Sequence, residues 1–598
     1  MSLRARIDAL ADFVETRTGA KRLLSHALDE PIAGGARWAY VFGSMLTAVF
    51  GLQAVTGLLL MSAYSPSTQT AWASVHHVTY VTQGGWLVRG LHHFGAQAMI
   101  VLLGMHLFQV ALFGAYKRPR EVNWWFGLLL LGATLAFSLT GYLLPWDQKG
   151  YWATRVATNI AGTIPVVGAS QQALIQGGSD YSSLTLTRFY ALHVGVLPAA
   201  LIGALVAHIA LFRKHGVTPP HGADLTRKDL FFPRQLWKDV QAAIVVFGVI
   251  VYFAFRHHGA PLDAPADPAS DYPARPEWYF LSLFELLKYF HGPLELLGTV
   301  VLPGLAGAYL FLLPLLDRKE SLRARDRVLP LLPLFGLGVA VVVLTVMALR
   351  HDARDEKFQA ARRRADLSAA KALALAAKGI PPEGPLAMMK ADPEVLGEAL
   401  FTKHCQGCHV LGDLGSREEA SAPVLDGWGS EAWVLSMLDD PDHDARFGRT
   451  PYKGMMPSMT RCKPDDASCK PMKPEDARSV AAFLAAGADD GAPPPTDAVR
   501  RDAARVRSGE AIVKTRCTTC HLYKGEGDDG GEGTAPELSG WGSRAWIRAQ
   551  VMNPASKATY REKALAPGMK KYMPAFEGEL KPAEADVLAA WVHQRARR

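Results

Sequence analysis

Four histidines in two apolar segments have the type and spacing needed to bind two haem irons. His92 and His106 are 14 residues apart in one segment, and His193 and His208 are 15 apart in another. An α-helix rises about 21 Å over 14 residues, close to four turns, so both histidines of a pair share one helix face. Two such helices would hold two stacked haems in a bilayer. A lone intramembrane histidine could instead bond a neighbouring helix; four at matched spacings favour haem.

Two C-x-x-C-H motifs have the pattern that attaches c-type haem covalently. A single copy could be a redox dithiol, but each copy here is followed by a Met-Pro pair whose sulfur could be the second axial ligand. The predicted c-haem residues are Cys405, Cys408, His409 and Met456 in the first copy, and Cys517, Cys520, His521 and Met573 in the second. Met455, Met459 and Met569 remain alternative sulfur ligands.

The two motifs lie in a tandem repeat. The sequence APVLDGWGSEAW from Ala422 recurs as APELSGWGSRAW from Ala535. Such self-similarity indicates duplication of one small helical haem domain, here called repeat 1 (389–490) and repeat 2 (491–598). Cys462 and Cys469 are left over, and a local disulfide is the state expected in an oxidising compartment. A thiol pair or a metal site is the alternative.

The elements that must position the histidines are membrane helices. Apolar residues make up 49% of the 598 residues, and they concentrate between about 38 and 350. Runs of about 20 apolar residues span a bilayer. Seven are expected, at 38–62, 90–114, 124–144, 189–212, 239–256, 296–316 and 328–349. No cleavable signal peptide is visible, so the first span would direct insertion.

Basic residues predict the orientation of these spans. They cluster before the first span and in alternate loops, at 117–120, 213–228 and 318–327, whereas loop 63–86 has none. Cytoplasmic loops carry the excess of Lys and Arg. The N-terminus is therefore expected in the cytoplasm, and seven crossings place the C-x-x-C-H repeats outside a bacterial inner membrane. The net charge of +8 fits contact with anionic lipid and requires no nucleic acid.

Helix direction assigns the haem pairs. The second and fourth spans both run inward, so His92 and His193 would bind the outer b haem, and His106 and His208 the inner one. Arg89 and Arg188 precede the outer ligands and would pair with haem propionates or act as interfacial anchors. A second spacing, between pairs of glycines, supports the pattern, because glycine lets the edge of a flat haem approach a helix. Glycines at this spacing can also be helix-packing contacts. These glycines, 14 residues apart in the first and third spans, are Gly43, Gly57, Gly127 and Gly141.

At this point a family resemblance is clear. The segments WLVRGLHHFGA, GYLLPWDQKGYWA and LTRFYALHVGVLP, together with Pro276-Glu277-Trp278-Tyr279, resemble cytochrome b of the quinol-oxidising bc and bf complexes. The resemblance covers about 20–350 and leans toward the bf branch, with cytochrome b (1–225) and subunit IV (226–350) joined. A linker helix (351–388) would lead to the repeats. The expected fold is all-α: a seven-helix transmembrane bundle followed by two small helical cytochrome c domains.

The resemblance implies a chemistry. Quinol would be oxidised at the outer face, with one electron passing through two b haems and the other through a Rieske iron–sulfur partner to two c haems. Glu277 would accept a quinol proton, which suits a carboxylate whose charge is disfavoured by an apolar pocket. Pro276, Trp278, Tyr279 and Tyr142 would shape that pocket. Taken alone, the four-residue motif could be an interfacial aromatic belt.

Two departures from the family pattern matter. No cysteine precedes Cys405, and Val41 lies near the place where the bf branch attaches an extra haem, so a covalent haem there is excluded. Arg213 and Lys214 would border a loosely held haem or the inner quinone site. No Rieske pattern is present, so that subunit must be another chain. A dimeric complex that delivers electrons to a further c-type cytochrome or terminal oxidase is expected.

Two other functions remain compatible with parts of the sequence. One is a membrane dihaem cytochrome b of another quinone-linked dehydrogenase or reductase. The other is a non-enzymatic, haem-bearing electron wire, as in a transporter or redox sensor.

Overall fold

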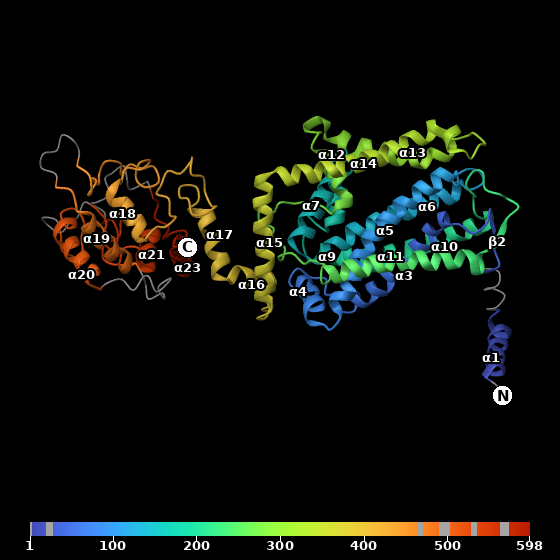
Figure 1. Cartoon of the computed structure of the whole chain (residues 1–598), viewed down its shortest axis with the longest axis horizontal. Helices are drawn as coiled ribbons and strands as arrows, with labels where there is room; N and C mark the ends of the chain where they lie inside the picture. Colours follow the sequence, from blue (N-terminus) through green and yellow to red (C-terminus); the bar gives the residue numbers. More distant parts are fainter. Residues whose placement is uncertain are drawn as a thin grey trace. The chain divides into compact units, whose positions relative to one another are not determined.

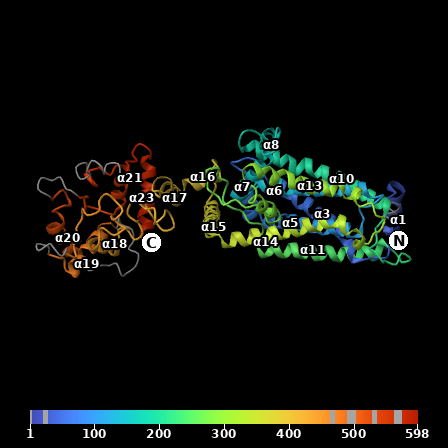
Figure 2. The same cartoon turned by 90° about the horizontal axis from the view of Figure 1, so that it is seen from above.

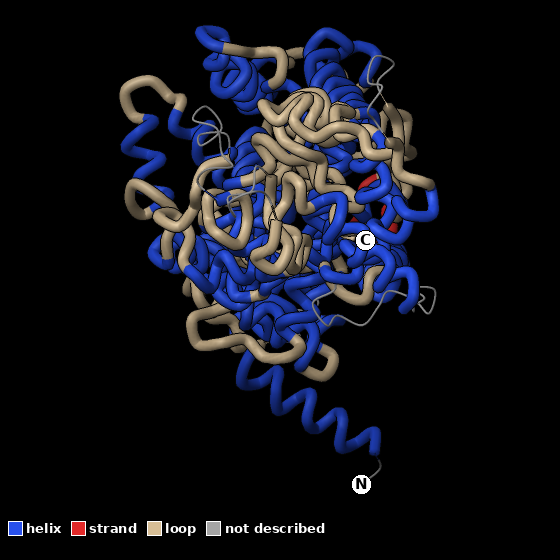
Figure 3. The backbone as a smooth tube through the Cα atoms, turned by 90° about the vertical axis from the view of Figure 1, so that its left-hand side faces the viewer, coloured by secondary structure: helices blue, strands red, loops and turns tan. Residues whose placement is uncertain are grey.

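The structure, a computed structural model, is predominantly helical. Its described residues are 3–19, 28–462, 470–488, 503–527, 535–561 and 573–597. The strands named within them are β1 (Pro31–Ala33) and β2 (Lys228–Leu230), which form one short antiparallel ribbon (Figure 3). This confirms the all-α prediction. Contacts divide the chain into two units, Met1–Met388 and Met389–Arg598, which are described separately.

The first unit contains the predicted number of membrane-spanning helical segments. Seven segments in the described part of the chain are long and apolar enough to cross a bilayer: Trp38–Met61, Gly85–Phe113, Glu121–Leu143, Ser183–His215, Phe231–Arg256, Gly292–Leu316 and Ala324–Arg354. Several extend beyond the apolar runs seen in the sequence, because polar residues continue the helix beyond the hydrophobic stretch. An amphipathic α1 (Leu3–Thr18) precedes them.

Two helix pairs form the centre of this unit. Helix α3 (Val41–Met61) packs along α5 (Gly85–Phe113), and α6 (Glu121–Leu143) packs along α10 (Leu197–His215). Helix α11 (Leu236–Arg256) covers α3 and α5, whereas α13 (Leu302–Leu316) and α14 (Val328–Arg354) run along the bundle (Figures 1 and 2). The predicted haem histidines therefore come from α5 in one pair and from the α10 segment in the other.

A buried charged cluster ties α13 and α14 to the C-terminal end of α5. Asp317 accepts a hydrogen bond from the hydroxyl of Tyr116 at 2.5 Å and forms an ion pair with Lys117 at 2.8 Å. The side chain of Arg327 is fully buried and donates to the carbonyl of Leu112 at 2.7 Å. Buried charges persist only where partners satisfy them, so this cluster fixes the position of three helix ends.

At the opposite end of the bundle, two loops join the helices. Asp147 caps α7 (Gln148–Gly162) by accepting from the backbone N–H of Gly150 at 2.8 Å. The amide of Gln148 donates to the carbonyl of Ala264, and that of Ala266 donates to Trp146. Loop 144–147 and the start of α7 are thereby held against loop 260–267. Short helices α4 (Ala71–His76), α8 (Gly168–Gln176), α9 (Ser183–Ala191) and α12 (Leu281–Leu287) complete this end.

The charged segment after the last span is divided. Helix α14 ends at Arg354, and the Asp355 side chain caps a new helix, α15 (Glu356–Ala376), by accepting from Phe358. Arg275 pairs with Asp352 at 2.9 Å and lies over the ring of Phe358 at 4.3 Å. This segment is thus anchored to the loop that carries Glu277. A further helix, α16 (Pro385–Ala391), precedes the second unit's first helix.

Two of the hydrophobic cores of the second unit are formed by packed helices. Its described helices are α17 (Pro393–His404), α18 (Glu431–Asp439), α19 (Pro474–Gly487), α20 (Ala503–Ile512), α21 (Arg544–Met552) and α23 (Pro582–Ala596). Helix α17 packs on α23, and α23 packs on α21. Helix α19 packs on α18 and on α20. The two groups are called lobe A (α17, α21, α23) and lobe B (α18, α19, α20), and each combines helices of both repeats.

Candidate functional site

The structure brings together the histidine rings that the sequence paired. The rings of His92 and His193 lie 6.4 Å apart between centroids, and those of His106 and His208 lie 6.5 Å apart. A metal–nitrogen bond of about 2.0–2.1 Å plus about 1.15 Å from each nitrogen to its ring centre gives roughly 6.4 Å for two imidazoles on one iron. Both pairs therefore fit bis-histidine haem, which when bound would supply one-electron transfer.

Hydrogen bonds orient three of these rings. The Nδ1 of His92 lies 3.0 Å from the hydroxyl of Thr56, and that of His193 lies 3.0 Å from the hydroxyl of Thr140. The Nδ1 of His208 lies 3.0 Å from the carbonyl oxygen of Asn123. A ligating histidine commonly fixes its ring through its second nitrogen in this way. The Nε2 atoms of these rings are thereby left as the iron-binding atoms.

The spacing of 15 residues in the second pair has a local cause. His193 lies in a π-helical turn, Leu192–Val196, between α9 and α10. In a regular helix 14 residues fall about 40° short of four turns, whereas 15 overshoot by about 60°. A π turn absorbs one extra residue, so His193 and His208 keep nearly the same relative orientation as His92 and His106. The sequence showed the spacing but not this compensation.

Each predicted glycine lies against one of the four imidazoles. A Cβ at Gly57 would be 3.2 Å from Cε1 of His92, and one at Gly141 only 2.6 Å from Cε1 of His193. Gly127 faces His208 at 3.4 Å, and Gly43 faces His106 at 3.7 Å. These glycines therefore leave room for the ligand rings themselves. The sequence interpretation had assigned that room to haem edges.

The two arginines that precede His92 and His193 contact backbone carbonyls. Arg89 donates to the carbonyl oxygens of Ala260 and Pro261, each at 2.7 Å. Arg188 donates to the carbonyl of Leu174 at 2.5 Å. Their predicted role toward haem propionates stays a prediction. At the other end of the bundle Arg213 pairs with Glu30 at 2.6 Å, and Lys214 is exposed.

The two C-x-x-C-H motifs have matching local geometry. The Nδ1 of His409 lies 2.8 Å from the carbonyl of Pro423, and that of His521 lies 2.8 Å from the carbonyl of Pro536. None of the four motif cysteines is in a disulfide, so their sulfurs are available for thioether bonds. Cys462 is disulfide-bonded; its predicted partner, Cys469, lies outside the described residues.

The methionines differ in burial. Met456 packs against the core of lobe B and Met573 against the core of lobe A. The sulfur of Met573 lies 3.3 Å from the side-chain nitrogen of Gln550. Met459 is also partly buried in lobe B, Met455 is 57% exposed, and Met569 lies outside the described residues.

The Pro276–Tyr279 motif lies beside the loop that follows α6. Glu277 forms an ion pair with Lys149 at 2.8 Å, and its side chain is only 13% exposed. The indole N–H of Trp278 donates to Gln97 on α5 at 3.3 Å. The hydroxyl of Tyr142 is buried without a hydrogen-bond partner among the described residues. Lys149 also lies 5.8 Å from the ring centroid of Tyr142, so one lysine adjoins both the carboxylate and the residue with the unsatisfied hydroxyl, which suits a polar ligand head. Lys149 was not among the predicted site residues.

Opposing effects set the proton affinity of this carboxylate. Burial raises the pKa of Glu277, but the charge and hydrogen bond of Lys149 lower it, and the net pKa lies below the ordinary value. Burial, followed by the nearby carboxylate of Asp263, raises the pKa of Asp147 to about 6. The carboxyl groups of Glu277 and Asp147 therefore bind protons in different pH ranges.

Models of known protein families match segments in both units of the chain. The family model described as cytochrome b/b6/petB matches residues 28–216, and that described as cytochrome b(C-terminal)/b6/petD matches 265–362. The cytochrome c model matches twice, at 395–487 and 506–596. The cytochrome bc complex cytochrome b subunit of Chlorobaculum thiosulfatiphilum is 34% identical over 311 residues, which are 51% of this chain and 72% of that protein.

The chain belongs to the cytochrome b family of bc complexes.

Other relatives agree. The menaquinol:cytochrome c reductase cytochrome b subunit of Bacillus subtilis is 41% identical over 184 residues, which are 31% of this chain and 82% of that protein. A solved structure, described as a hyperthermophilic respiratory Complex III, has a TM-score of 0.50 and 27% identity, and covers 59% of this chain and 93% of its own. This multi-pass membrane cytochrome thus performs electron transfer of the quinol–cytochrome c reductase type and has b-type and c-type haem domains.

Proposed function

We propose that this chain is the cytochrome b/c subunit of a proton-translocating quinol–cytochrome c oxidoreductase. Quinol is oxidised beside Glu277 on the outer face of a bacterial inner membrane. One electron crosses the membrane through two b haems, and the other passes through a Rieske partner to two c haems. The complex is a dimer that feeds a further c-type cytochrome or terminal oxidase.

The observation that carries this proposal is the buried Glu277 beside the unpartnered hydroxyl of Tyr142. At the reacting end of a quinol, the hydroxyl group needs a hydrogen-bond partner that holds it and a group that accepts its proton. Tyr142 and Glu277 provide these two functions, and Trp278 and Tyr279 supply aromatic surface for the ring. In the resting state Lys149 holds Glu277 ionised, which is the form that can accept a proton.

The position of this site relative to the histidine pairs supports the same function. Trp278 reaches Gln97 on α5, and the amide of Gln97 lies 2.8 Å from the ring of His93, which is next to His92 in the chain. Arg89, one turn before His93, holds the loop 260–261 that leads toward the motif. The proposed quinol site thus adjoins the outer pair rather than the inner one. Electrons leaving quinol would have the outer haem as their near acceptor.

Replacement of Glu277 by Gln tests the proposal. The amide cannot accept the proton, and loss of a general base typically slows a reaction by about 10²–10⁴-fold. Quinol-dependent reduction of the b haems and external acidification should both slow in membranes containing Glu277→Gln. Asp271→Asn, an exposed change in the same loop, is the matched control. Unchanged quinol oxidation and proton release in Glu277→Gln would rule out this site.

A further inference from the structure

The two lobes of the second unit exchange halves of the two sequence repeats. Lobe A joins the helix before Cys405 with the last two described helices of repeat 2, whereas lobe B joins α18 and α19 of repeat 1 with the first helix of repeat 2. Figures 1 and 2 both show α17 beside α23 and α19 beside α20. Lobe B therefore comes from one stretch of chain, and lobe A is assembled from the two stretches on either side of it.

The helix crossings show this exchange at single residues. Gly397 in α17 and Gly509 in α20 have equivalent places in the two repeats, before Glu-Ala-Leu and Glu-Ala-Ile. A side chain at Gly397 would collide with Trp591 of repeat 2. A Cβ at Gly509 would lie 2.7 Å from Cβ of Phe483 in repeat 1. Each glycine therefore lies where its helix crosses a helix of the other repeat, against an aromatic residue of that helix.

The chain changes lobe at the repeated Gly-Trp-Gly segments. Gly427, Gly429, Gly540 and Gly542 all have positive φ, a conformation that glycine adopts without steric cost. Trp428 and Trp541 lie 5.0 Å apart between ring centroids, where the two crossover segments meet. The Nε2 of His593 lies 2.7 Å from the carbonyl of Ala488, and the amide of Gly427 donates to Ala596 at 2.7 Å. These contacts link the repeats in addition to the shared cores.

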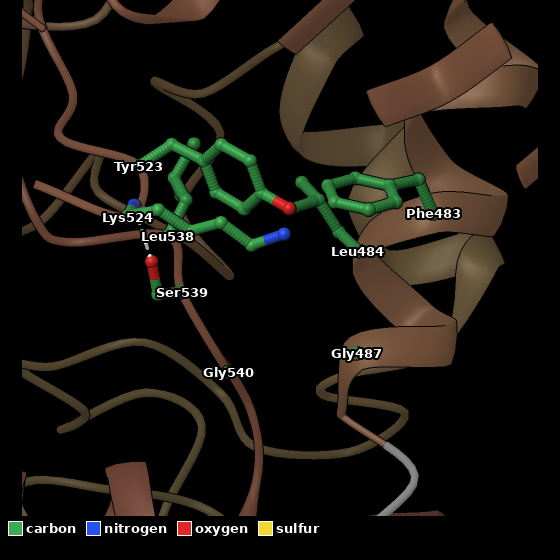
Figure 4. A pocket seen from close by; sticks show the side chains of 8 residues that line it. All are labelled: Phe483, Leu484, Gly487, Tyr523, Lys524, Leu538, Ser539 and Gly540. Carbon is green, nitrogen blue, oxygen red and sulfur yellow. Dashed lines mark hydrogen bonds between the residues drawn. The ribbon is translucent and has the colours of Figure 1, made fainter. Parts of the chain in front are cut away.

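The first cysteine of each motif and the two predicted methionine ligands follow the exchange. Cys405 and Met573 pack against the core of lobe A, and Cys517 and Met456 pack against that of lobe B. A small cavity of about 180 Å³ in lobe B is likewise lined from both repeats (Figure 4). Repeat 1 contributes Phe483, Leu484 and Gly487, and repeat 2 contributes Tyr523, Lys524, Leu538, Ser539 and Gly540. The environment of each C-x-x-C-H motif is thus completed by the other repeat.

We propose that each c haem is attached by one repeat and receives its methionine ligand from the other. The haem at Cys405, Cys408 and His409 takes Met573, and the haem at Cys517, Cys520 and His521 takes Met456. The proposal rests on covalent haem at both motifs, as the cytochrome c matches imply, and not on quinol oxidation. Without the exchange each haem would take the methionine of its own repeat.

Single-haem versions of the full chain distinguish the two pairings. Replacing Cys517 and Cys520 by Ala leaves one c haem, at Cys405. In that background Met573→His should abolish the sulfur-to-iron charge-transfer band and lower the midpoint potential, and Met456→His should leave both unchanged. The reciprocal background, with Cys405 and Cys408 replaced by Ala, should give the reciprocal result. Spectra of chemically oxidised and reduced protein suffice, so a failure of quinol oxidation would not affect the result. A response to Met456→His in the first background would overturn the proposal.

A double-mutant cycle on the chain with both C-x-x-C-H motifs intact covers the case in which single-haem chains do not accumulate. A Cβ at Gly397 would lie 2.4 Å from Cβ of Trp591, so Gly397→Ala should lower the Tm, and Trp591→Gly should relieve that loss. The matched change Phe483→Gly should not relieve it, because Phe483 lies against α20 rather than α17. Residues in contact show coupled effects on stability, whereas the effects of separate sites add. Coupling of Gly397→Ala to Phe483→Gly instead would overturn the proposal.

Discussion

Lys149 controls the proton affinity of Glu277, and its removal should shift the pH dependence of quinol oxidation. In Lys149→Gln the ammonium is lost, so burial is opposed only by the smaller effects of His93 and of the Trp278 backbone, and the pKa of Glu277 rises. Two unit charges 4 Å apart interact by about 4 kcal/mol at an effective dielectric of 20. The Lys149 side chain is 30% exposed, so screening reduces this to about 1.5–3 kcal/mol, or roughly one to two pKa units.

The sign of the shift follows from the base role. Glu277 accepts a proton only when ionised, so activity falls on the acid side as the pH drops through its pKa. The acid limb of the rate of b-haem reduction by quinol should therefore move upward by roughly one to two pH units in Lys149→Gln. Stopped-flow measurements in membranes between about pH 4.5 and 8 would record it, and other titrations of the complex cancel in the ratio to wild type.

Lys149→Arg is the matched control, because it keeps the positive charge and should restore the wild-type acid limb. An acid limb that stays in place in Lys149→Gln, or moves to lower pH, would refute the reasoning. Equal shifts in Lys149→Gln and Lys149→Arg would also refute it, since they would point to a steric effect rather than to charge.

Three further outcomes can be checked. Gly141→Ala should displace the ring of His193, because a Cβ would lie 2.6 Å from that ring, and should lower the content of outer b haem in spectra of the purified chain. Gly132→Ala, on the same helix with open space around it, should leave the haem content unchanged. His208→Leu should remove the inner b haem and keep both c haems in a pyridine haemochrome assay, whereas loss of every b haem would indicate misfolding. The raised pKa of Asp147 makes the native state bind an extra proton between about pH 4 and 6. The contribution of Asp147 to stability should therefore fall as the pH rises through that window. The difference between the Tm of the wild type and that of Asp147→Asn should decrease across this window and then stay constant.

Much of the membrane unit could be predicted because helices convert spacing into geometry. His92 and His106 share a face whatever surrounds them, and the pairing with His193 and His208 follows from helix direction. The π turn at His193 could not be read from the sequence, because it is a local choice between two hydrogen-bond patterns. Lys149 was missed for another reason: it lies in the first turn of α7 and meets Glu277, 128 residues later in the chain, only when that turn packs against the loop that carries Glu277.

The exchange between the repeats illustrates a different limit. Repeat 1 and repeat 2 carry the same pattern of glycine, cysteine, methionine and aromatic residues, so either pairing of their halves buries similar helix surfaces. Sequence periodicity then identifies the modules but not their partners. The two helix crossings differ, with Trp591 in lobe A and Phe483 in lobe B, but whether such a difference favours one pairing depends on three-dimensional packing.

The order of assembly of the second unit follows from its nested lobes. Lobe B closes contacts between neighbouring helices, such as α19 and α20, whereas lobe A must bring Gly397 to Trp591 near the end of the chain. Local contacts generally form before distant ones, because a longer loop costs more entropy to close. Lobe B should therefore fold first. The motif at Cys405 remains without its partner helices from repeat 2 until the end of the chain has been synthesised. A prematurely terminated chain would lose its first haem pocket together with its second repeat.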